Sequence, residues 1–186
     1  PSSDILCLEA ARQSVVLLKN RNDAVLPIAL PKERTSSSLA LVGPHANTTT
    51  RLLGMYVGSG NRLITQRSAL TLMRARLGAH QLHYAPGMPS LESTDTGGFA
   101  EAVAAAKTAT TVVVMLGLCE QGHGCTEHEN QDRSTLSLPT TQLALLKAVS
   151  TAAANTNVVC VFISGGPLSV DALDELCDAA LWTAYP

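Results

Sequence analysis

The stretch TVVVMLGLCEQGHGCTEHENQDRSTLSLP, residues 111–139, joins an unbroken apolar run to a long polar connection. A run that is apolar throughout is typical of a strand buried on both faces of a sheet. Connections inside compact domains are mostly about 4–6 residues long, and structureless ones beyond about 12–15 residues are usually functional or disordered. This connection concentrates ionisable side chains as no other segment does: Glu120, His123, Glu127, His128, Glu129, Asp132 and Arg133. The functional residues are therefore expected in it.

On both sides of this stretch, apolar strands alternate with helices, and glycine, proline or polar clusters separate them. The patterns predict strands at residues 39–43, 80–84, 111–117, 157–163 and 179–185, and helices at 5–20, 67–77, 97–109, 139–154 and 169–176. Apolar strands that alternate with helices indicate a parallel sheet covered on both faces. The fold class is therefore predicted as α/β: a single domain over residues 1–186, a mostly parallel sheet flanked by helices in three αβα layers.

One edge of such a sheet is the expected functional edge. In open α/β sheets, ligands bind outside the carboxyl ends of the strands, where loops and helix N-termini converge. Three connections would share that edge: Gly43-Pro44-His45, the long connection at 118–138, and the Ser-Gly-Gly-Pro turn at 164–167. The long connection is therefore expected to face the other two.

Composition narrows the class of partner. The chain of 186 residues is 46% hydrophobic and 15% charged, with a formal net charge of −2. This balance, with no basic stripe and interleaved aromatics, gives no sign of nucleic-acid binding. The longest apolar runs are far shorter than the roughly 20 residues of a membrane span. No nucleic acid and no membrane partner are expected, and no N-terminal signal region is visible.

The cysteines leave the compartment open. Cys7, Cys160 and Cys177 lie in apolar contexts and are interpreted as buried small hydrophobic residues. Cys119 and Cys125 flank the first part of the long connection, and a disulfide between them is plausible if the protein is secreted. The pairing stays open, as do a secreted and a lysosomal location.

Several kinds of site fit the sequence poorly. No glycine-rich phosphate cradle follows a strand, and Gly165–Gly166 is more typical of a tight turn. No G-x-S-x-G elbow is present, and Ser164 is a weak substitute for one. Structural zinc usually needs two close ligand pairs separated by a longer gap. The candidate set lies within one short segment, so no metal is expected: Cys119, His123, Cys125 and His128.

Two carboxylates remain as candidates for chemistry. Glycoside hydrolysis needs one carboxylic acid to protonate the leaving oxygen and a second carboxylate as nucleophile or base. Glu127 and Glu129 would project to the same side if this stretch were extended, and their repulsion would raise the pKa of one of them. The alternative is a solvated acidic loop with a weak Asp132–Arg133 ion pair. Spacing alone favours that alternative.

The whole chain resembles the second, α/β-sandwich domain of family 3 glycoside hydrolases, the β-glucosidase and β-xylosidase family. Each motif is weak alone, but their order and spacing together are specific. The motifs are AARQSVVLLKN (10–20), LALVGPHAN (39–47), LLGMYVG (52–58), YAPG (84–87), FAEAVAAAKTATTVVVMLGL (99–118), ExExxDRSTLSLPTTQ (127–142), VFISGGPLSV (161–170) and LWTAYP (181–186).

The resemblance implies a retaining exo-β-glycosidase that cleaves terminal β-linked glucose or xylose. In the family, an N-terminal barrel domain binds the terminal sugar and supplies an aspartate nucleophile, and the second domain brings an acid/base glutamate to the barrel mouth. The acid/base role is carried to Glu129 first and to Glu127 second. Asp132 and Arg133 would hold the loop or contact substrate, and His128 could contact substrate. No metal or organic cofactor is implied.

The resemblance also sets expectations about the chain itself. Neither the barrel nor its nucleophile motif is visible, and the family usually continues beyond Tyr185-Pro186. A fragment that is inactive alone is therefore expected. The segment 119–125 lengthens the loop relative to the simplest members, which leaves the choice of glutamate open. Two alternatives remain: a non-catalytic sugar-binding or scaffold domain, and a relative of the family's N-acetylglucosaminidases or phosphorylases, some of which carry the acid/base on the barrel.

Overall fold

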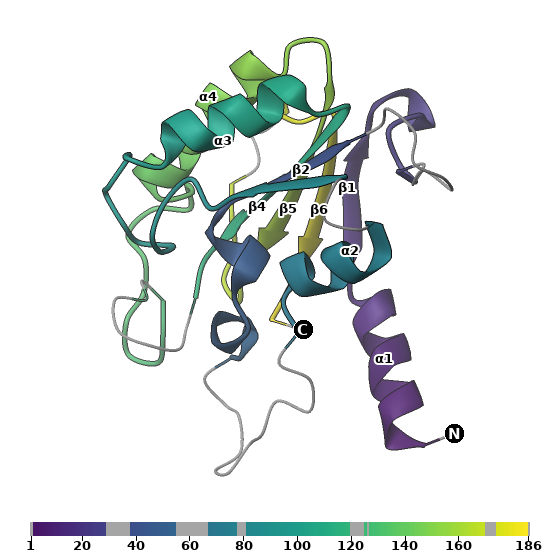
Figure 1. Ribbon diagram of the computed structural model, residues 1–186. Coiled ribbons are helices and arrows are strands. Elements are labelled where there is room, and N and C mark those ends of the chain that lie inside the picture. The colour runs from purple at the N-terminus through teal and green to yellow at the C-terminus, as the bar shows by residue number, and fades with distance from the viewer. Residues whose placement is uncertain are drawn as a thin grey trace.

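The computed structural model describes residues 2–28, 38–54, 67–77, 81–119, 125, 127–169 and 174–185. Within these ranges, six strands form one sheet in the order β1-β6-β5-β4-β2-β3 (Figure 1). The strands are β1 (Val16–Asn20), β2 (Leu39–Val42), β3 (Leu82–Ala85), β4 (Thr111–Gly117), β5 (Asn157–Ile163) and β6 (Ala179–Thr183). All neighbouring pairs are parallel except β1 with β6. The predicted α/β class with a mostly parallel sheet is confirmed.

Helices cover both faces of the sheet. The described α-helices are α1 (Ser3–Gln13), α2 (Ala69–Leu77), α3 (Phe99–Thr108) and α4 (Thr140–Ala152). Figure 1 shows α3 and α4 on one face and α2 on the other. Successive β4 residues alternate between the two cores: Val112 and Val114 pack with α3 and α4, whereas Val113 packs with α2. This alternation is why the β4 sequence has no polar face.

The first predicted helix is wrong in its second half. Instead of running over residues 5–20, α1 ends at Gln13 and β1 begins at Val16. The apolar residues of this segment suit either helical or strand spacing, and antiparallel pairing with β6 decides for the strand. The predicted helix at 169–176 lies partly outside the described residues, and its last three residues form a turn. No described helix is long and apolar enough to cross a bilayer.

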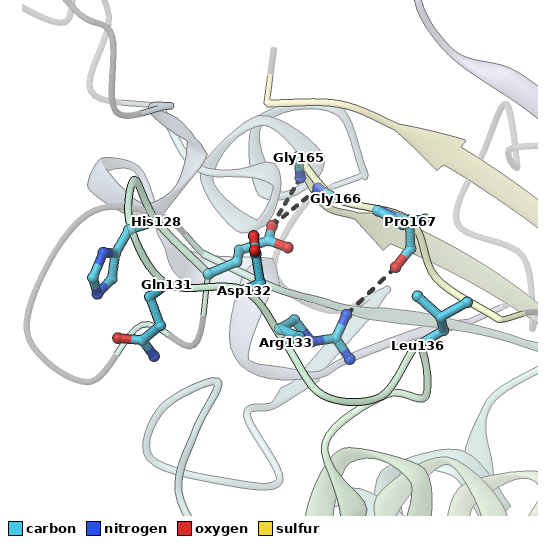
Figure 2. A pocket seen from close by; sticks show the side chains of 9 residues that line it. His128, Gln131, Asp132, Arg133, Leu136, Gly165, Gly166 and Pro167 are labelled. Carbon is cyan, nitrogen blue, oxygen red and sulfur yellow. Dashed lines mark hydrogen bonds between the residues drawn. The ribbon is translucent and has the colours of Figure 1, made fainter.

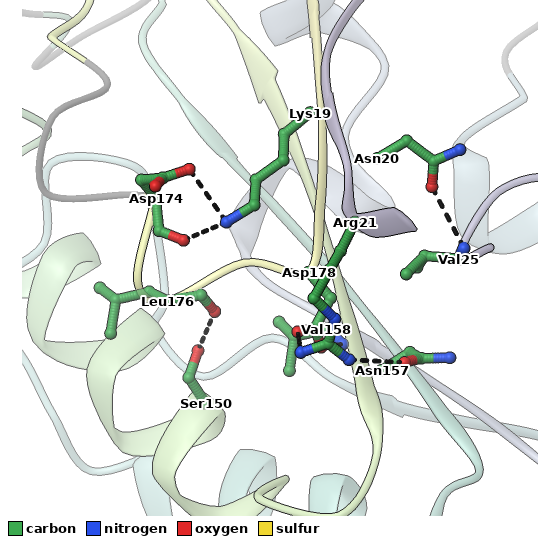
Figure 3. Close-up of polar contacts among 10 residues, drawn as sticks. All are labelled: Lys19, Asn20, Arg21, Val25, Ser150, Asn157, Val158, Asp174, Leu176 and Asp178. Carbon is green, nitrogen blue, oxygen red and sulfur yellow. Dashed lines mark hydrogen bonds and ion pairs between the residues drawn. The ribbon is translucent and has the colours of Figure 1, made fainter. Parts of the chain in front are cut away.

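Ion pairs fasten β1 to the segment that precedes β6 (Figure 3). Lys19 Nζ lies 2.9 Å from Asp174 Oδ1, and Arg21 Nη1 lies 2.5 Å from Asp178 Oδ1. The second oxygen of Asp178 accepts the Val158 amide of β5 at 2.8 Å. Asp178 therefore links three neighbouring strands at the edge opposite the long connection.

The structure confirms that Cys160 and Cys177 are buried, shows that they are paired, and corrects the interpretation of Cys7. Cys160 of β5 forms a disulfide with Cys177, which precedes β6, across a Cα–Cα distance of 5.9 Å. Cys7 is free and exposed on α1 rather than buried. Parallel pairing of β5 with β6 brings Cys160 beside the turn that carries Cys177, and local sequence context does not reveal such a pairing.

A buried glutamine fixes the end of β4. Gln142 of α4 accepts the Gly117 amide at 2.9 Å and donates to the carbonyls of Gly117 (2.8 Å) and Leu91 (2.7 Å). Its side chain is completely buried. Gly117 has a φ of 146°, and a Cβ there would lie 1.8 Å from the Ile163 carbonyl oxygen. The start of the long connection is thus held closely against β5 and α4.

Replacing Gln142 with leucine should destabilise the domain strongly. Three buried backbone groups would lose their partners, and the expected loss in the free energy of unfolding is about 3 kcal/mol. Urea unfolding of the purified protein measures it. Lys147→Leu, at an exposed position of the same helix, is the control and should change stability by less than about 0.5 kcal/mol. Equal stability of Gln142→Leu and wild type would contradict this role for Gln142.

Candidate functional site

The long connection leaves the sheet between two backbone anchors. The Leu118 amide donates to the Ile163 carbonyl at 2.8 Å, and the Leu118 carbonyl accepts a hydrogen bond from His45 Nε2 at 2.9 Å. Cys119 and Cys125 form a disulfide with a Cα–Cα distance of 5.2 Å. The sequence left this pairing open. Glu120 and His123 lie outside the described residues.

Beyond the disulfide, the chain makes a tight turn that carries Glu129. His128 and Gln131 form an isolated antiparallel bridge, with the Gln131 amide donating to the His128 carbonyl at 2.9 Å. Asn130 has a φ of 67°, and a positive φ at the third position is the mark of a type II turn. Glu129 therefore sits at the tip of the turn with its side chain exposed.

Glu127 immediately precedes this turn and is only 8% exposed. Its Oε1 accepts hydrogen bonds from the amides of Gly165 (3.0 Å) and Gly166 (3.2 Å) and from the Tyr185 hydroxyl (2.5 Å). The two amide contacts are dashed in Figure 2. Glu127 thus joins the long connection to the turn after β5 and to the segment after β6.

The two glutamates do not share one side of an extended strand. The chain turns at residues 128–131, one carboxylate is buried and the other is exposed. The expectation that mutual repulsion between Glu127 and Glu129 creates an acid therefore lacks its geometric basis. The two glutamates differ in burial instead, and sequence spacing alone does not reveal that difference.

A pocket of about 350 Å³ opens between the connection and the turn after β5 (Figure 2). Residues 127–136 supply one wall through His128, Asp132 and Arg133, and the other wall is the 165–167 turn. Four of the five predicted site residues line this pocket: Glu127, His128, Asp132 and Arg133. Glu129 is not one of the lining residues and lies in the adjacent 128–131 turn. Asp132 is exposed, as is His128, whose Nδ1 lies 2.8 Å from the Glu129 carbonyl oxygen.

Arg133 braces the loop through backbone carbonyls. Its guanidinium donates to the carbonyls of Ser137 and Pro167, the latter at 3.4 Å. Among the residues that the structure describes, it forms no ion pair with Asp132. The weak Asp132–Arg133 pair of the solvated-loop interpretation is therefore wrong.

Side chains from the segments after β2 and after β3 contact the disulfide at the start of the loop. Arg51 Nη1 lies 2.6 Å from Cys125 Sγ, and Glu92 Oε1 lies 2.9 Å from Cys119 Sγ. Burial raises the pKa of Glu92, and the Arg51 charge opposes that rise. Glu92 and the two sulfurs lie within 4.8 Å of one another. The thiolate is the metal-binding form of cysteine, so this cluster is not a metal centre while the disulfide is closed.

Sequence reasoning missed the partners of Glu127. The Gly165–Gly166 pair is typical of a tight turn, and the structure shows in addition that its amides bind a carboxylate. Nothing in the local sequence of Tyr185 links it to residue 127. The one available signal was that the turn at 164–167 shares the carboxyl edge of the sheet with the long connection.

Comparison with known proteins identifies the family. A model of the glycosyl hydrolase family 3 C-terminal domain matches residues 15–186. The chain belongs to glycosyl hydrolase family 3. A probable exo-1,4-beta-xylosidase, xlnD, of Aspergillus japonicus is 36% identical over 181 residues, which cover 96% of this chain and 21% of that protein. Probable beta-D-xylosidase 7 of Arabidopsis thaliana is 36% identical over 188 residues, covering 100% of this chain and 23% of that protein.

Solved structures of the family agree with the fold. A GH3 exo-beta-xylosidase, XlnD, in complex with a xylobiose aziridine activity-based probe matches with a TM-score of 0.76 and 33% identity, over 100% of this chain and 22% of that one. A Bifidobacterium adolescentis GH3 beta-glucosidase also matches with a TM-score of 0.76, at 34% identity over 97% of this chain and 24% of that one. The chain thus spans about a fifth of the length of the family 3 relatives it matches.

His45 should make the stability of this edge depend on pH. Burial, together with the Arg51 charge, lowers its pKa from 6.5 to about 4 against the opposing effect of the Leu118 hydrogen bond. The Leu118 carbonyl only accepts, so Nε2 carries the proton, and Nδ1 has no partner among the described residues. Because the folded-state pKa lies below the unfolded one, stability is full above pH 6.5 and falls as the pH drops toward 4.

The His45 contribution to this loss should be about 3 kcal/mol. Urea unfolding at pH 7 and pH 4.5 (about two and a half pH units apart) measures most of it. A His45→Gln variant keeps a side-chain N–H for Leu118 but does not titrate, so it should lose less stability on acidification. Equal losses in wild type and variant would contradict the low pKa of His45.

Proposed function

We propose that this domain is the acid/base-bearing second domain of a retaining exo-β-glycosidase that acts on terminal β-linked xylose or glucose, and that Glu129 is the acid/base. The observation that carries the choice of residue is the contrast in environment. Glu129 is exposed at the tip of a tight turn, whereas Glu127 is buried with Oε1 taken up by three donors. A residue that transfers a proton to substrate must be accessible to it, and of the two glutamates Glu129 is the exposed one.

The chemistry needs two carboxylates on opposite sides of the glycosidic bond. In the proposed mechanism, an aspartate of a separate barrel domain attacks the anomeric carbon, and the Glu129 carboxylic acid gives its proton to the departing oxygen. The resulting Glu129 carboxylate then takes a proton from water, whose oxygen attacks the same carbon and releases the aspartate. Glu129 ends the cycle protonated, so protons balance over the two steps.

The other site residues would have different tasks. We assign the leaving-group side of the substrate to His128 and Asp132, because both are exposed and line the pocket beside the Glu129 turn. Arg133 holds the loop through the carbonyls of Ser137 and Pro167 and would act by shaping the pocket. No step of this mechanism uses a metal or an organic cofactor.

An N-terminal barrel domain is the proposed partner within the same protein. The length of the relatives supports this, as does a concentration of exposed apolar side chains on α1 and β1. Exposed apolar patches of this kind mark contact surfaces. The proposed substrate is a carbohydrate, and the xylosidase names of the curated relatives favour xylose. The domain alone should be inactive, because acid/base help without nucleophile and sugar subsite stabilises the transition state too little.

The test is turnover by the full-length enzyme. Glu129→Ala should lower kcat/KM on natural disaccharides by about 10²–10⁴-fold, because general acid catalysis is lost. An aryl glycoside with a good leaving group needs less acid help, so its turnover should recover when azide replaces water as the second nucleophile. Glu101→Ala, at an exposed position of α3, is the control.

Unchanged turnover of Glu129→Ala would contradict the acid/base assignment and favour a scaffold role for the loop. It would also fit the relatives that carry the acid/base on the barrel, and a histidine–aspartate pair in the barrel sequence would separate these two explanations.

A further inference from the structure

The Glu127 carboxylate and the Tyr185 hydroxyl form a clasp with the amides of Gly165 and Gly166. We infer that Glu127 and Tyr185 are positioning residues, which set the reach of Glu129 without themselves transferring a proton. The inference rests on the proposed function of Glu129. It assigns roles to two residues and a turn that lie outside the acid/base assignment itself.

The clasp gathers the ends of three adjacent parallel strands. Glu127 follows β4, Gly165 and Gly166 follow β5, and Tyr185 follows β6. The three donor-to-acceptor distances to Glu127 Oε1 are 3.0, 3.2 and 2.5 Å. Hydrogen bonds to a charged acceptor are roughly twice as strong as neutral ones, and the burial of Glu127 limits competition from water. The clasp therefore restrains the loop more firmly than an exposed ion pair would.

Gly166 gives independent support for the clasp. A Cβ at this position would lie 2.6 Å from Glu127 Oε2, and only the Glu127 carboxylate stands in its way. The turn is thus shaped to receive a carboxylate at close range. A side chain at Gly166 would push the carboxylate out of the clasp without removing any ionisable group.

The clasp controls Glu129 because the two glutamates are so close in the chain. Two residues of extended backbone span at most about 7 Å. The His128–Gln131 bridge then fixes the direction of the turn between them. With Glu127 anchored and the bridge closed, the backbone of Glu129 has little freedom to move away from the pocket.

Conservative variants separate positioning from proton transfer. In Glu127→Gln, the amide oxygen still accepts from the glycine amides and Tyr185, but the side chain no longer carries a transferable proton. In Glu127→Ala, Gly166→Ala and Tyr185→Phe the clasp is lost or weakened while Glu129 is intact. Tyr84→Phe removes a hydroxyl on β3 instead and serves as the matched control.

The kinetic experiment compares these variants in the full-length enzyme. Glu127→Gln should keep kcat within about tenfold of wild type, and Tyr185→Phe should lower kcat about tenfold, as expected for one lost hydrogen bond to a charged group. Glu127→Ala and Gly166→Ala should lower kcat more than they raise KM, and azide should restore none of them. If Glu127→Gln fell as far as Glu129→Gln and Glu127→Ala were rescued by azide, Glu127 would be the acid and the inference would be overturned.

Hydrogen exchange on the same full-length variants tests the clasp apart from catalysis. Glu127→Ala and Tyr185→Phe should speed exchange in peptides that cover residues 127–133 and 164–168, and Glu129→Gln should not. Unchanged exchange in both clasp variants would overturn the inference. Faster exchange with normal turnover of all variants, Glu129→Gln included, would instead locate the failure in the proposed function of Glu129.

Discussion

The buried Glu127 carboxylate is the contact on which the architecture of the site depends. Its three donors come from beyond β5 and β6, so one oxygen atom ties the long connection to two other strand ends. A buried carboxylate without such partners would be strongly destabilising. The amides of residues 165–166 and the Tyr185 hydroxyl therefore stabilise Glu127 in its buried position. The exposed position of Glu129 follows from that restraint together with the turn at 128–131.

Other hydrogen bonds at this edge of the sheet hold the two ends of the long connection in place. Gly117 and Gln142 hold the end of β4, and His45 holds the next carbonyl. At the far end, Arg133 reaches Pro167, while the Ser169 amide donates to the Leu136 carbonyl at 2.8 Å. Both ends of the connection are therefore fixed to the sheet by hydrogen bonds to backbone groups, and residues 128–132 between them present exposed side chains. This is how a parallel sheet builds a site from loops beyond its strands.

The sequence predicted what depends on local pattern. The unbroken apolar runs of β4 and β5 specify buried parallel strands, and the proline-led start of α4 gave its position closely. The prediction of the α1–β1 boundary is wrong because the apolar pattern of residues 16–20 suits both a helix and a strand, and only pairing with β6 decides for the strand. The Cys160–Cys177 disulfide was missed for the same reason, since strand pairing creates the proximity.

The candidate site divides in the same way. Its five residues were expected close together because they all lie within residues 127–133 of one polar connection, and four of them line the pocket. The different environments of Glu127 and Glu129 could not be predicted, because the donors to Glu127 lie 38, 39 and 58 residues away in the sequence.

The most direct test of Glu129 as the acid/base is a crystal structure of the full-length enzyme with an uncleavable sulfur-linked disaccharide. We expect a Glu129 carboxyl oxygen about 3 Å from the linking sulfur, with the Glu127 carboxylate still hydrogen-bonded to the amides of Gly165 and Gly166. A Glu127 carboxyl at the sulfur, with Glu129 turned away, would contradict it.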